Sequence, residues 1–307
     1  MKTVRLKFVD GVEHYAGFLR RVIEKKYAIE ESDSPDFLFY GDDTAEQHRN
    51  YRDCVKIYVP IENHYPDFSY CHYALGFHNI RSPRHLYFPY YLNEFNAEDL
   101  VKNLNEVDEV IKQKDKFCAF VVSNGNKRRT RSRIQFFEKL NARKHVDSLG
   151  RFMNNVGYTL PYESKEVQRC LSFYKFYIAF ENHSAPYYTT EKLPKAMLSR
   201  AVPIYYGNPR IAEEFNPKSF INVHDFKNFD EAVEYILEVD ADDAKYRALQ
   251  AEPYFYDNKP SVLFSEERLG AFLAKIFEGP APRLDLLPVK HYLYEWWKKA
   301  KPYWGAH

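Results

Sequence analysis

The chain contains 307 residues, which is long for a single hydrophobic core, and this length predicts two domains. Apolar residues make up 45% of the sequence and charged residues 28%, as in an ordinary soluble globular protein. The 44 basic residues nearly balance the 43 acidic ones, so the net charge of +1 gives no overall field that would attract nucleic acid. Aromatic residues reach 17%, a richness that suits ring-lined clefts for sugars and is equally compatible with a bias in genome composition.

Cysteine usage and hydropathy predict a cytoplasmic protein. The four cysteines are widely spaced and form no CxxC or Cys/His pattern for zinc, which favours a reducing compartment. The first residues, MKTVRLKFVDG, alternate as a strand does and lack the apolar core of a signal peptide. No uncharged apolar run approaches the length that a bilayer-spanning helix needs.

The first third of the chain alternates between strands and helices. Apolar runs predict strands over residues 4–8, 37–40, 55–59, 73–77 and 86–88. Helical periodicity is found over residues 12–27 and 97–112. This alternation predicts an α/β domain over residues 1–114.

A second α/β unit is predicted over residues 115–285. It opens with a strand at residues 117–122 and the turn Ser123-Asn124-Gly125-Asn126, followed by a basic run that leads into a helix. Further strands are predicted over residues 176–180, 202–206 and 220–223, and further helices from residue 190 and over residues 230–239 and 266–277. A basic run before a helix is usually a solvated face, but its position after a strand end favours contact with a ligand.

The stretch from Phe173 to Asn208 carries the pattern of a βαβ crossover in a parallel sheet. Ligands of such sheets bind at the carboxyl ends of the strands, which here means the loop after Phe180. The helix start at Glu191-Lys192 suits a phosphate, because its N–H groups and the ammonium both favour negative charge. No Gly-rich nucleotide signature is present, so local chemistry also fits a charged helix start packed under an aromatic loop.

The sequence FENHSAPYYTTEKLPKAMLSRAVPIYYGNP resembles the signature of glycosyltransferase family 10, the α-1,3/α-1,4-fucosyltransferases. The shared pattern is F-E-N, a short aromatic loop, T-E-K, a helix, and then V/I-P-(I/V)-x-x-G. The residues EEFNPKSFINVHDFKNFDEAVEYI that follow are similar to bacterial members of the family. Similarity also extends upstream through FCAFVVSNGN and IENHYPDFSYCHYALGF, and covers residues 55–240.

The resemblance implies two Rossmann-like domains in the GT-B arrangement, with acceptor and GDP-fucose meeting in an interdomain cleft. The implied reaction is an inverting transfer of L-fucose to the 3-OH of GlcNAc or Glc in N-acetyllactosamine- or lactose-type acceptors, as in Lewis-type glycans. The alternatives are α-1,4 transfer to type 1 chains, or a non-catalytic protein that binds GDP-sugars or glycans. Retention of Glu62 beside the FEN and TEK motifs argues against the non-catalytic alternative, since a binder needs no base.

Two glutamates are the catalytic candidates that the resemblance implies. Glu62 matches the family glutamate that acts as the base, although Ile61 stands where the family usually has Gly. Glu191, of the TEK motif, is expected to contact fucose or ribose and to offset positive charge on the sugar. Judged locally, Glu62 would be a solvated loop residue and Glu191 a favourable acid in a first helical turn.

Six residues are expected to bind GDP-fucose. Arg133 and Lys192 are assigned to the diphosphate, with Arg131 and Arg129 as rivals of Arg133 because extra residues precede the helix. The other four candidates are Asn182 for the ribose, Tyr188 at the nucleotide, Glu191, and Ser123 in the turn after the strand.

No metal or other cofactor is expected to be required, although Mn²⁺ or Mg²⁺ would stimulate GDP release. Asp240-Ala241-Asp242 has the D-x-D form of a metal site, but it lies at a helix end away from any strand-end cleft, where carboxylates are normally hydrated.

Residues 286–307 form a basic aromatic tail in which Trp296, Trp297 and Trp304 alternate with lysines. This composition favours peripheral contact with an anionic inner membrane. A segment docked on the first domain or on a second subunit explains it equally well. Heptad repeats found in some bacterial relatives are absent, so the oligomeric state, monomer or homodimer, stays open.

Overall fold

The computed structural model describes residues 1–14, 16–123, 125, 127–160 and 165–286. Within these residues the strands form two sheets, one in each half of the chain, and every strand is parallel to its neighbours. The tail from residue 287 onward, with the tryptophans that we assigned to a membrane or to a docking contact, lies outside the described residues.

The two sheets share one winding pattern. The first contains β1 (Lys2–Val9), β2 (Tyr27–Glu31), β3 (Phe37–Tyr40), β4 (Val55–Tyr58), β5 (Tyr73–Gly76) and β6 (His85–Tyr87). The second contains β7 (Lys116–Phe120), β8 (Asp147–Ser148), β9 (Tyr174–Phe180), β10 (Val202–Tyr206) and β11 (Ile221–Asn222). Their orders are β2-β1-β3-β4-β5-β6 and β11-β10-β9-β7-β8, so in each sheet the second strand lies outside the first and the later strands extend from its other side. This is a doubly wound, Rossmann-like order, and it confirms the α/β class predicted from the sequence.

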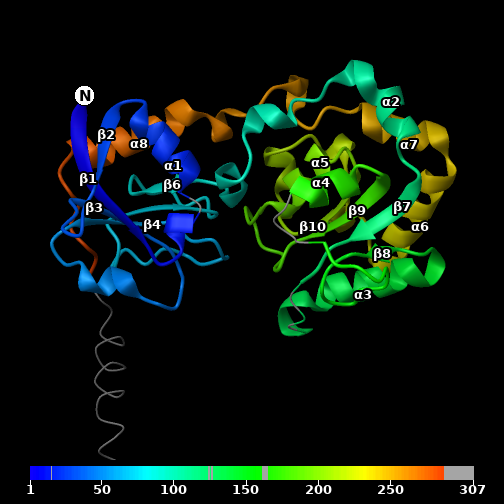
Figure 1. Cartoon of the computed structure of the whole chain (residues 1–307), viewed down its shortest axis with the longest axis horizontal. Helices are drawn as coiled ribbons and strands as arrows, with labels where there is room; N and C mark the ends of the chain where they lie inside the picture. The colour runs from blue at the N-terminus through cyan, green and yellow to red at the C-terminus, as the bar shows by residue number, and fades with distance from the viewer. Residues whose placement is uncertain (15, 124, 126, 161–164, 287–307) are drawn as a thin grey trace, which may run out of the picture.

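Helices cover the second sheet on both faces, whereas α1 (Gly17–Glu24) and α8 (Glu266–Glu278) cover one face of the first sheet (Figure 1). The other helices in the described ranges are α2 (Val107–Lys112), α3 (Lys127–Arg143), α4 (Lys165–Leu171), α5 (Lys192–Leu198), α6 (Phe229–Ala241) and α7 (Asp243–Ala251). Alternation along β9 explains the two layers, because successive side chains of a strand point to opposite faces. Phe176 and Ile178 share a core cluster with α3 and α6, whereas Tyr177 and Ala179 share one with α4 and α5.

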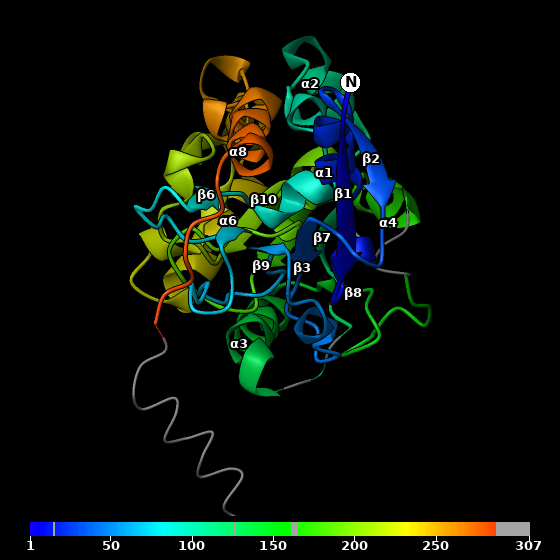
Figure 2. The same ribbon diagram turned by 90° about the vertical axis from the view of Figure 1, so that its left-hand side faces the viewer.

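The last helix departs from the domain division expected from the sequence. We placed residues 115–285 in the second domain, but α8 packs beside α1 on the first sheet (Figures 1 and 2). Phe277 of α8 lies edge-on to Tyr27 and Phe37, with ring centroids 5.2 and 4.7 Å apart. The amphipathic pattern shows that α8 has an apolar face, but the pattern carries no information about which sheet that face covers.

The predicted helices over residues 97–112 and 12–27 are each confirmed only in part, by α2 and by α1. The first is divided into the 3-10 turns Ala97–Leu100 and Leu104–Glu106 and the short α2. Between these turns Lys102 is buried and donates to the carbonyls of Gln250 and Glu252 at 3.0 and 2.6 Å, which pulls the backbone out of a helical path. The second is shortened because Tyr27 pairs with Lys2 and so begins β2.

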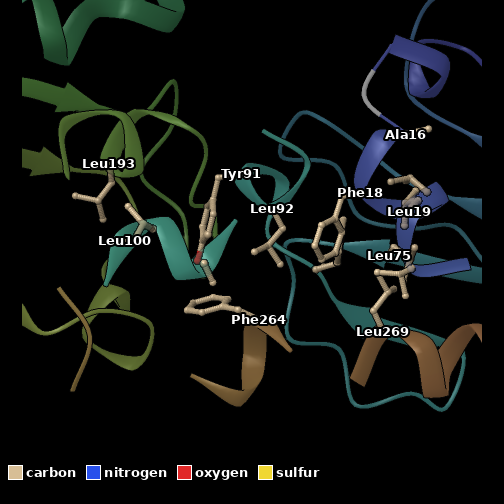
Figure 3. Close-up of a cluster of buried hydrophobic side chains, with 14 of the residues drawn as sticks. Ala16, Phe18, Leu19, Leu75, Tyr91, Leu92, Leu100, Leu193, Phe264 and Leu269 are labelled. Carbon is tan, nitrogen blue, oxygen red and sulfur yellow. The ribbon is translucent and has the colours of Figure 1, made fainter. Parts of the chain in front are cut away.

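One hydrophobic cluster runs from the first sheet into the second domain (Figure 3). Leu75 and Phe18 lie at its first-domain end, and Leu193 of α5 lies at the other. Between them, Tyr91 and Phe264 pack with ring centroids 5.7 Å apart. A buried apolar interface of this kind fixes the orientation of two domains more firmly than a polar one would.

No helix in the described ranges is both long and apolar enough to cross a bilayer.

Candidate functional site

A cavity of about 650 Å³ opens at the carboxyl ends of β7 and β9. These strands flank the point at which the winding of the second sheet reverses, and ligands of doubly wound sheets bind in the crevice at such a point. Five of the residues predicted to bind the donor line this cavity, namely Ser123, Arg133, Asn182, Glu191 and Lys192. Tyr188, the sixth predicted residue, does not line the cavity, and binding of a donor there stays a prediction.

Arg133 is a buried cation at the wall of this cavity. Its side chain is 6% exposed, and its Nη2 donates to Oδ1 of Asn182. Its Nε is also buried and has no hydrogen-bond partner in the described part of the chain. Arg131 is exposed and does not line the cavity, and the side chain of Arg129 lies outside the described residues. The geometry thus favours Arg133 over Arg131 as an anion ligand.

Lys192 provides the second cation. Its Nζ donates to Oγ1 of Thr190 at 2.8 Å and lies 3.2 Å from Oε1 of Glu191 and 3.4 Å from Oε2 of Glu181. Burial alone would lower the pKa of Lys192, but the Glu191 and Glu181 carboxylates outweigh that effect and raise it. The ammonium therefore stays charged.

Glu181 of the FEN motif anchors the loop that leads to Lys192, a role that our reading of the sequence did not assign. Its carboxylate accepts hydrogen bonds from the N–H of Thr190 at 2.8 Å and from Oγ1 of the same residue at 2.6 Å. Gly207 is required beside it, because a Cβ there would lie 2.3 Å from Cγ of Glu181. The ten residues from Glu181 of F-E-N to Thr190 of T-E-K thus form a loop that is closed by hydrogen bonds to one carboxylate.

Arg151 is a further cation in the cavity lining that the sequence reading missed. It follows Gly150, at which an added Cβ would lie 2.1 Å from the carbonyl oxygen of Val122. This close approach brings the segment after β8 against the end of β7. The only signal in the sequence was a Gly-Arg pair, which is too common to single out.

Glu62 and Tyr188 meet across the two domains. The Tyr188 hydroxyl donates to Oε2 of Glu62 at 3.3 Å, and its ring lies edge-on to Phe77 with centroids 4.9 Å apart. Burial raises the pKa of Tyr188 above its usual value, so the hydroxyl stays a donor. The structure therefore brings the predicted base of the first domain to the loop that carries Glu191 and Lys192.

Asp42, which the sequence reading also missed, fixes the loop that carries Glu62. Its carboxylate accepts from the N–H of Ile61 at 3.3 Å and of Glu62 at 3.1 Å, and it contacts the His64 ring at 2.9 Å. Asp42 follows β3 and Glu62 follows β4, so the contact exists only because these strands are neighbours.

Glu214 joins the same loop to the first domain. It is 1% exposed and accepts from Thr189 at 3.0 Å, from Asn208 at 2.7 Å and from the Tyr91 hydroxyl at 3.2 Å. Tyr91 belongs to the first half of the chain, so this buried carboxyl connects the two domains. Burial raises the pKa of Glu214 to about 7, and the hydrogen bonds from its neighbours oppose this rise.

The D-x-D pattern has a structural explanation. Asp240 is paired with Lys175 at 2.8 Å and with Lys144, and Asp242 caps α7 by accepting from the N–H groups of Ala244 and Lys245. In the described residues, no group of three or more His, Cys, Asp or Glu side chains is arranged to hold a metal ion.

The chain thus folds into two Rossmann-like domains, with a cationic pocket at the winding point of the second domain and with Glu62 of the first domain in contact with the loop that carries Lys192. Comparison with known proteins identifies the family. Residues 111–256 match the family profile described as glycosyltransferase family 10 (fucosyltransferase) C-term. Residues 4–93 match the alpha-(1,3)-fucosyltransferase FucT N-terminal domain.

Individual relatives agree with the profiles. Alpha-(1,3)-fucosyltransferase FucT of Helicobacter pylori is 29% identical over 306 residues, which covers 84% of this chain and 61% of that protein. A 4-alpha-L-fucosyltransferase of Bos taurus, FUT3, is 41% identical over 140 residues, covering 44% of this chain and 36% of the relative. This chain thus spans less than two thirds of the length of these relatives.

A solved structure of an alpha1,3-fucosyltransferase with GDP-fucose superposes with a TM-score of 0.78 and 28% identity, covering 93% of this chain and 94% of that one. A solved structure of an alpha1,3-fucosyltransferase with GDP superposes with a TM-score of 0.75 and 27% identity, covering 91% of each chain. The chain belongs to glycosyltransferase family 10, the fucosyltransferases, and the predicted family and GT-B fold are confirmed.

The buried carboxyl of Glu214 predicts a pH-dependent stability. Its pKa of about 7 in the folded protein lies above the ordinary 4.5, so the folded state binds the proton more tightly than the unfolded chain does. The resulting stabilisation is complete below pH 4.5 and is lost as the pH rises to 7. Relative to Glu214→Gln, which cannot titrate, the free energy of unfolding of the wild type should fall by on the order of 3 kcal/mol over this range.

Urea unfolding of both proteins at several pH values measures this difference. Glu213→Gln is the matched control, because the neighbouring carboxylate is 43% exposed and pairs with Arg210 at the surface. A difference between wild type and Glu214→Gln that stays constant with pH would show that Glu214 remains ionised in the folded protein.

Proposed function

We propose that this protein transfers L-fucose from GDP-fucose, with inversion, to the 3-OH of GlcNAc or Glc in acceptors of the N-acetyllactosamine or lactose type. The observation that carries the proposal is the contact between Tyr188 and Glu62. It joins a carboxylate of the first domain to the loop that carries Glu191 and Lys192, and this supports a reaction in which an acceptor hydroxyl held by Glu62 meets the activated sugar. Similarity to an alpha1,3-fucosyltransferase with bound GDP-fucose supports the choice of donor.

In the proposed reaction, the acceptor oxygen attacks C1 of fucose on the face opposite the diphosphate. The bond between C1 and the diphosphate oxygen breaks, and its electron pair leaves with GDP. Glu62 takes the proton of the acceptor hydroxyl, a general-base role typically worth about 10²–10⁴ in rate. A single displacement of this kind needs one base and inverts the anomeric centre.

The second domain stabilises the charges that develop. Arg133 offers a planar fork to two phosphate oxygens, and Lys192 offers a point charge, so both favour the departing diphosphate. Glu191 lies beside Lys192 in the cavity wall and would offset the positive charge on the sugar. Asn182 and Ser123, which line the same cavity, are assigned to the nucleoside end of the donor.

A second candidate is α-1,4 transfer to type 1 chains. The relative from Bos taurus, which is named a 4-alpha-L-fucosyltransferase, matches at 41% identity over 140 residues, a higher identity than that of the alpha-(1,3)-fucosyltransferase of Helicobacter pylori. Assays with type 1 and type 2 disaccharides and with lactose separate the two linkages.

Acceptor-dependent GDP release tests the transferase activity and the role of Glu62 together. Wild-type protein should release GDP from GDP-fucose much faster with N-acetyllactosamine than without it. Glu62→Gln should bind GDP-fucose within a few-fold of wild type by calorimetry, and its transfer rate should fall at least ~10²-fold. GDP binding without acceptor-stimulated release in the wild type would favour a non-catalytic binder, and near-normal turnover in Glu62→Gln would place the base elsewhere.

Arg133→Ala should weaken the binding of GDP itself, because it removes a charge-assisted contact to the diphosphate worth roughly 1.5–3 kcal/mol. Calorimetry with GDP should show a loss of roughly tenfold or more. Arg131→Ala is the matched control, since Arg131 is exposed and lies outside the cavity lining. The assignment fails if Arg131→Ala weakens GDP binding and Arg133→Ala does not.

We further propose that the two cations replace a metal ion in neutralising the diphosphate. Activity should then survive EDTA, with Mn²⁺ or Mg²⁺ adding stimulation by assisting GDP release. Complete loss of activity in EDTA, restored by either ion, would contradict this proposal.

A further inference from the structure

A second cavity, of about 220 Å³, lies in the first domain at the carboxyl ends of β3 and β4. Tyr40 and Tyr58, the last residues of these strands, form its floor. The carboxyl edge is the side on which ligands of parallel sheets bind. Its position therefore marks it as a candidate ligand site that the donor pocket does not include.

The walls of this cavity are unusually aromatic and exposed. Tyr65 is 71% exposed and Tyr70 38% exposed, and both line the cavity together with Tyr58. The ring of Tyr65 is held flat against the buried ring of His78, with centroids 3.4 Å apart and planes 6° from parallel. A tyrosine fixed on one face in this way presents a rigid apolar surface on the other, and little conformational entropy is lost when a ligand packs on it.

The polar groups of the cavity suit a neutral ligand with hydroxyl groups. Glu46 and Asp67 supply carboxylate acceptors, and Arg49 supplies donors while paired with Glu46 at 2.9 Å. His48 is paired with the buried Asp10 at 2.6 Å. The carboxylates outnumber the arginine, so a phosphate or an acidic sugar would be repelled. Aromatic faces combined with such hydrogen-bonding groups match a pyranose ring, which has an apolar C–H face and a hydroxyl rim.

Residues that line the cavity belong to the same strand ends as the loop that carries the proposed base. Tyr65 follows Glu62 by three residues, and Tyr58 precedes it by four, on the strand that leads into the same loop. Asp42, whose carboxylate holds the backbone of Glu62, follows Tyr40 by two residues. A sugar in this cavity would therefore belong to the same chain as a sugar whose hydroxyl reaches Glu62.

We propose that this cavity is an acceptor subsite that binds a neutral sugar ring beyond the ring that receives fucose. This inference rests on the proposed function, because it assigns the cavity to the acceptor of that reaction. Its size suits one ring, so the protein would prefer acceptors longer than a disaccharide. Such a preference would make chain length, as well as linkage, a determinant of specificity.

The test compares an N-acetyllactosamine disaccharide with a linear tetrasaccharide of two such units. Wild type should use the tetrasaccharide with the lower KM. Tyr65→Ala and Tyr70→Ala should each reduce the ratio of kcat/KM for tetrasaccharide over disaccharide by about tenfold, which corresponds to about 1.4 kcal/mol for one lost ring contact. Tyr65→Phe should keep the ratio, because the ring remains. Tyr256→Ala, an exposed tyrosine of the second half of the chain, is the control and should also keep it.

Ligand-observed NMR with free tetrasaccharide and no GDP-fucose separates the two proposals. Loss of tetrasaccharide binding in Tyr65→Ala supports the subsite even if no acceptor is fucosylated, in which case the proposed function alone fails. Transfer that occurs with an unchanged ratio in both Tyr65→Ala and Tyr70→Ala overturns the subsite and leaves the function in place.

Discussion

The ion pair between Lys192 and the buried Glu181 is the interaction on which the cationic pocket of the second domain depends. Glu181 accepts both hydrogen bonds that Thr190 can donate, and this closes the loop after β9 so that Glu191 and Lys192 face the cavity. An uncompensated carboxylate in this position would be costly, because burial penalises an ionised group that has no partner. The pair therefore keeps the Lys192 ammonium charged and also stabilises the loop that presents it.

The same loop sets the relation between the two domains. Tyr188 and Thr189 belong to this loop and directly precede Thr190. Tyr188 contacts Glu62, and Thr189 contacts Glu214, which in turn contacts Tyr91 of the first half of the chain. A hydrophobic cluster surrounds these polar contacts and extends into both domains. Because one short segment lines the cationic pocket, touches the proposed base and joins the domains, small shifts in it would alter the pocket and the position of the proposed base together.

Prediction from the sequence worked where the signal was local. Strand ends and the TEK helix start placed Ser123, Asn182 and Lys192 in the lining of one cavity, as the structure shows. It failed where a distant contact overrides periodicity, as at Lys102, which is buried against carbonyls from around residue 250 and interrupts the expected helix. Asp42 was missed for a related reason, since an acidic residue after a strand does not indicate which neighbouring loop will donate hydrogen bonds to it.

By itself, the sequence determined the α/β class, the parallel crossover over residues 173–208, and, through its motifs, the family to which the chain belongs. Periodicity and strand-end chemistry are properties of contiguous residues, so they can be recognised from the sequence alone. Tertiary structure alone decided that α8 returns to the first sheet, that Arg133 rather than Arg131 enters the cavity, and that Glu62 meets Tyr188. These outcomes depend on which buried surfaces and charges meet across 49 or more residues of chain, and no local pattern encodes that pairing.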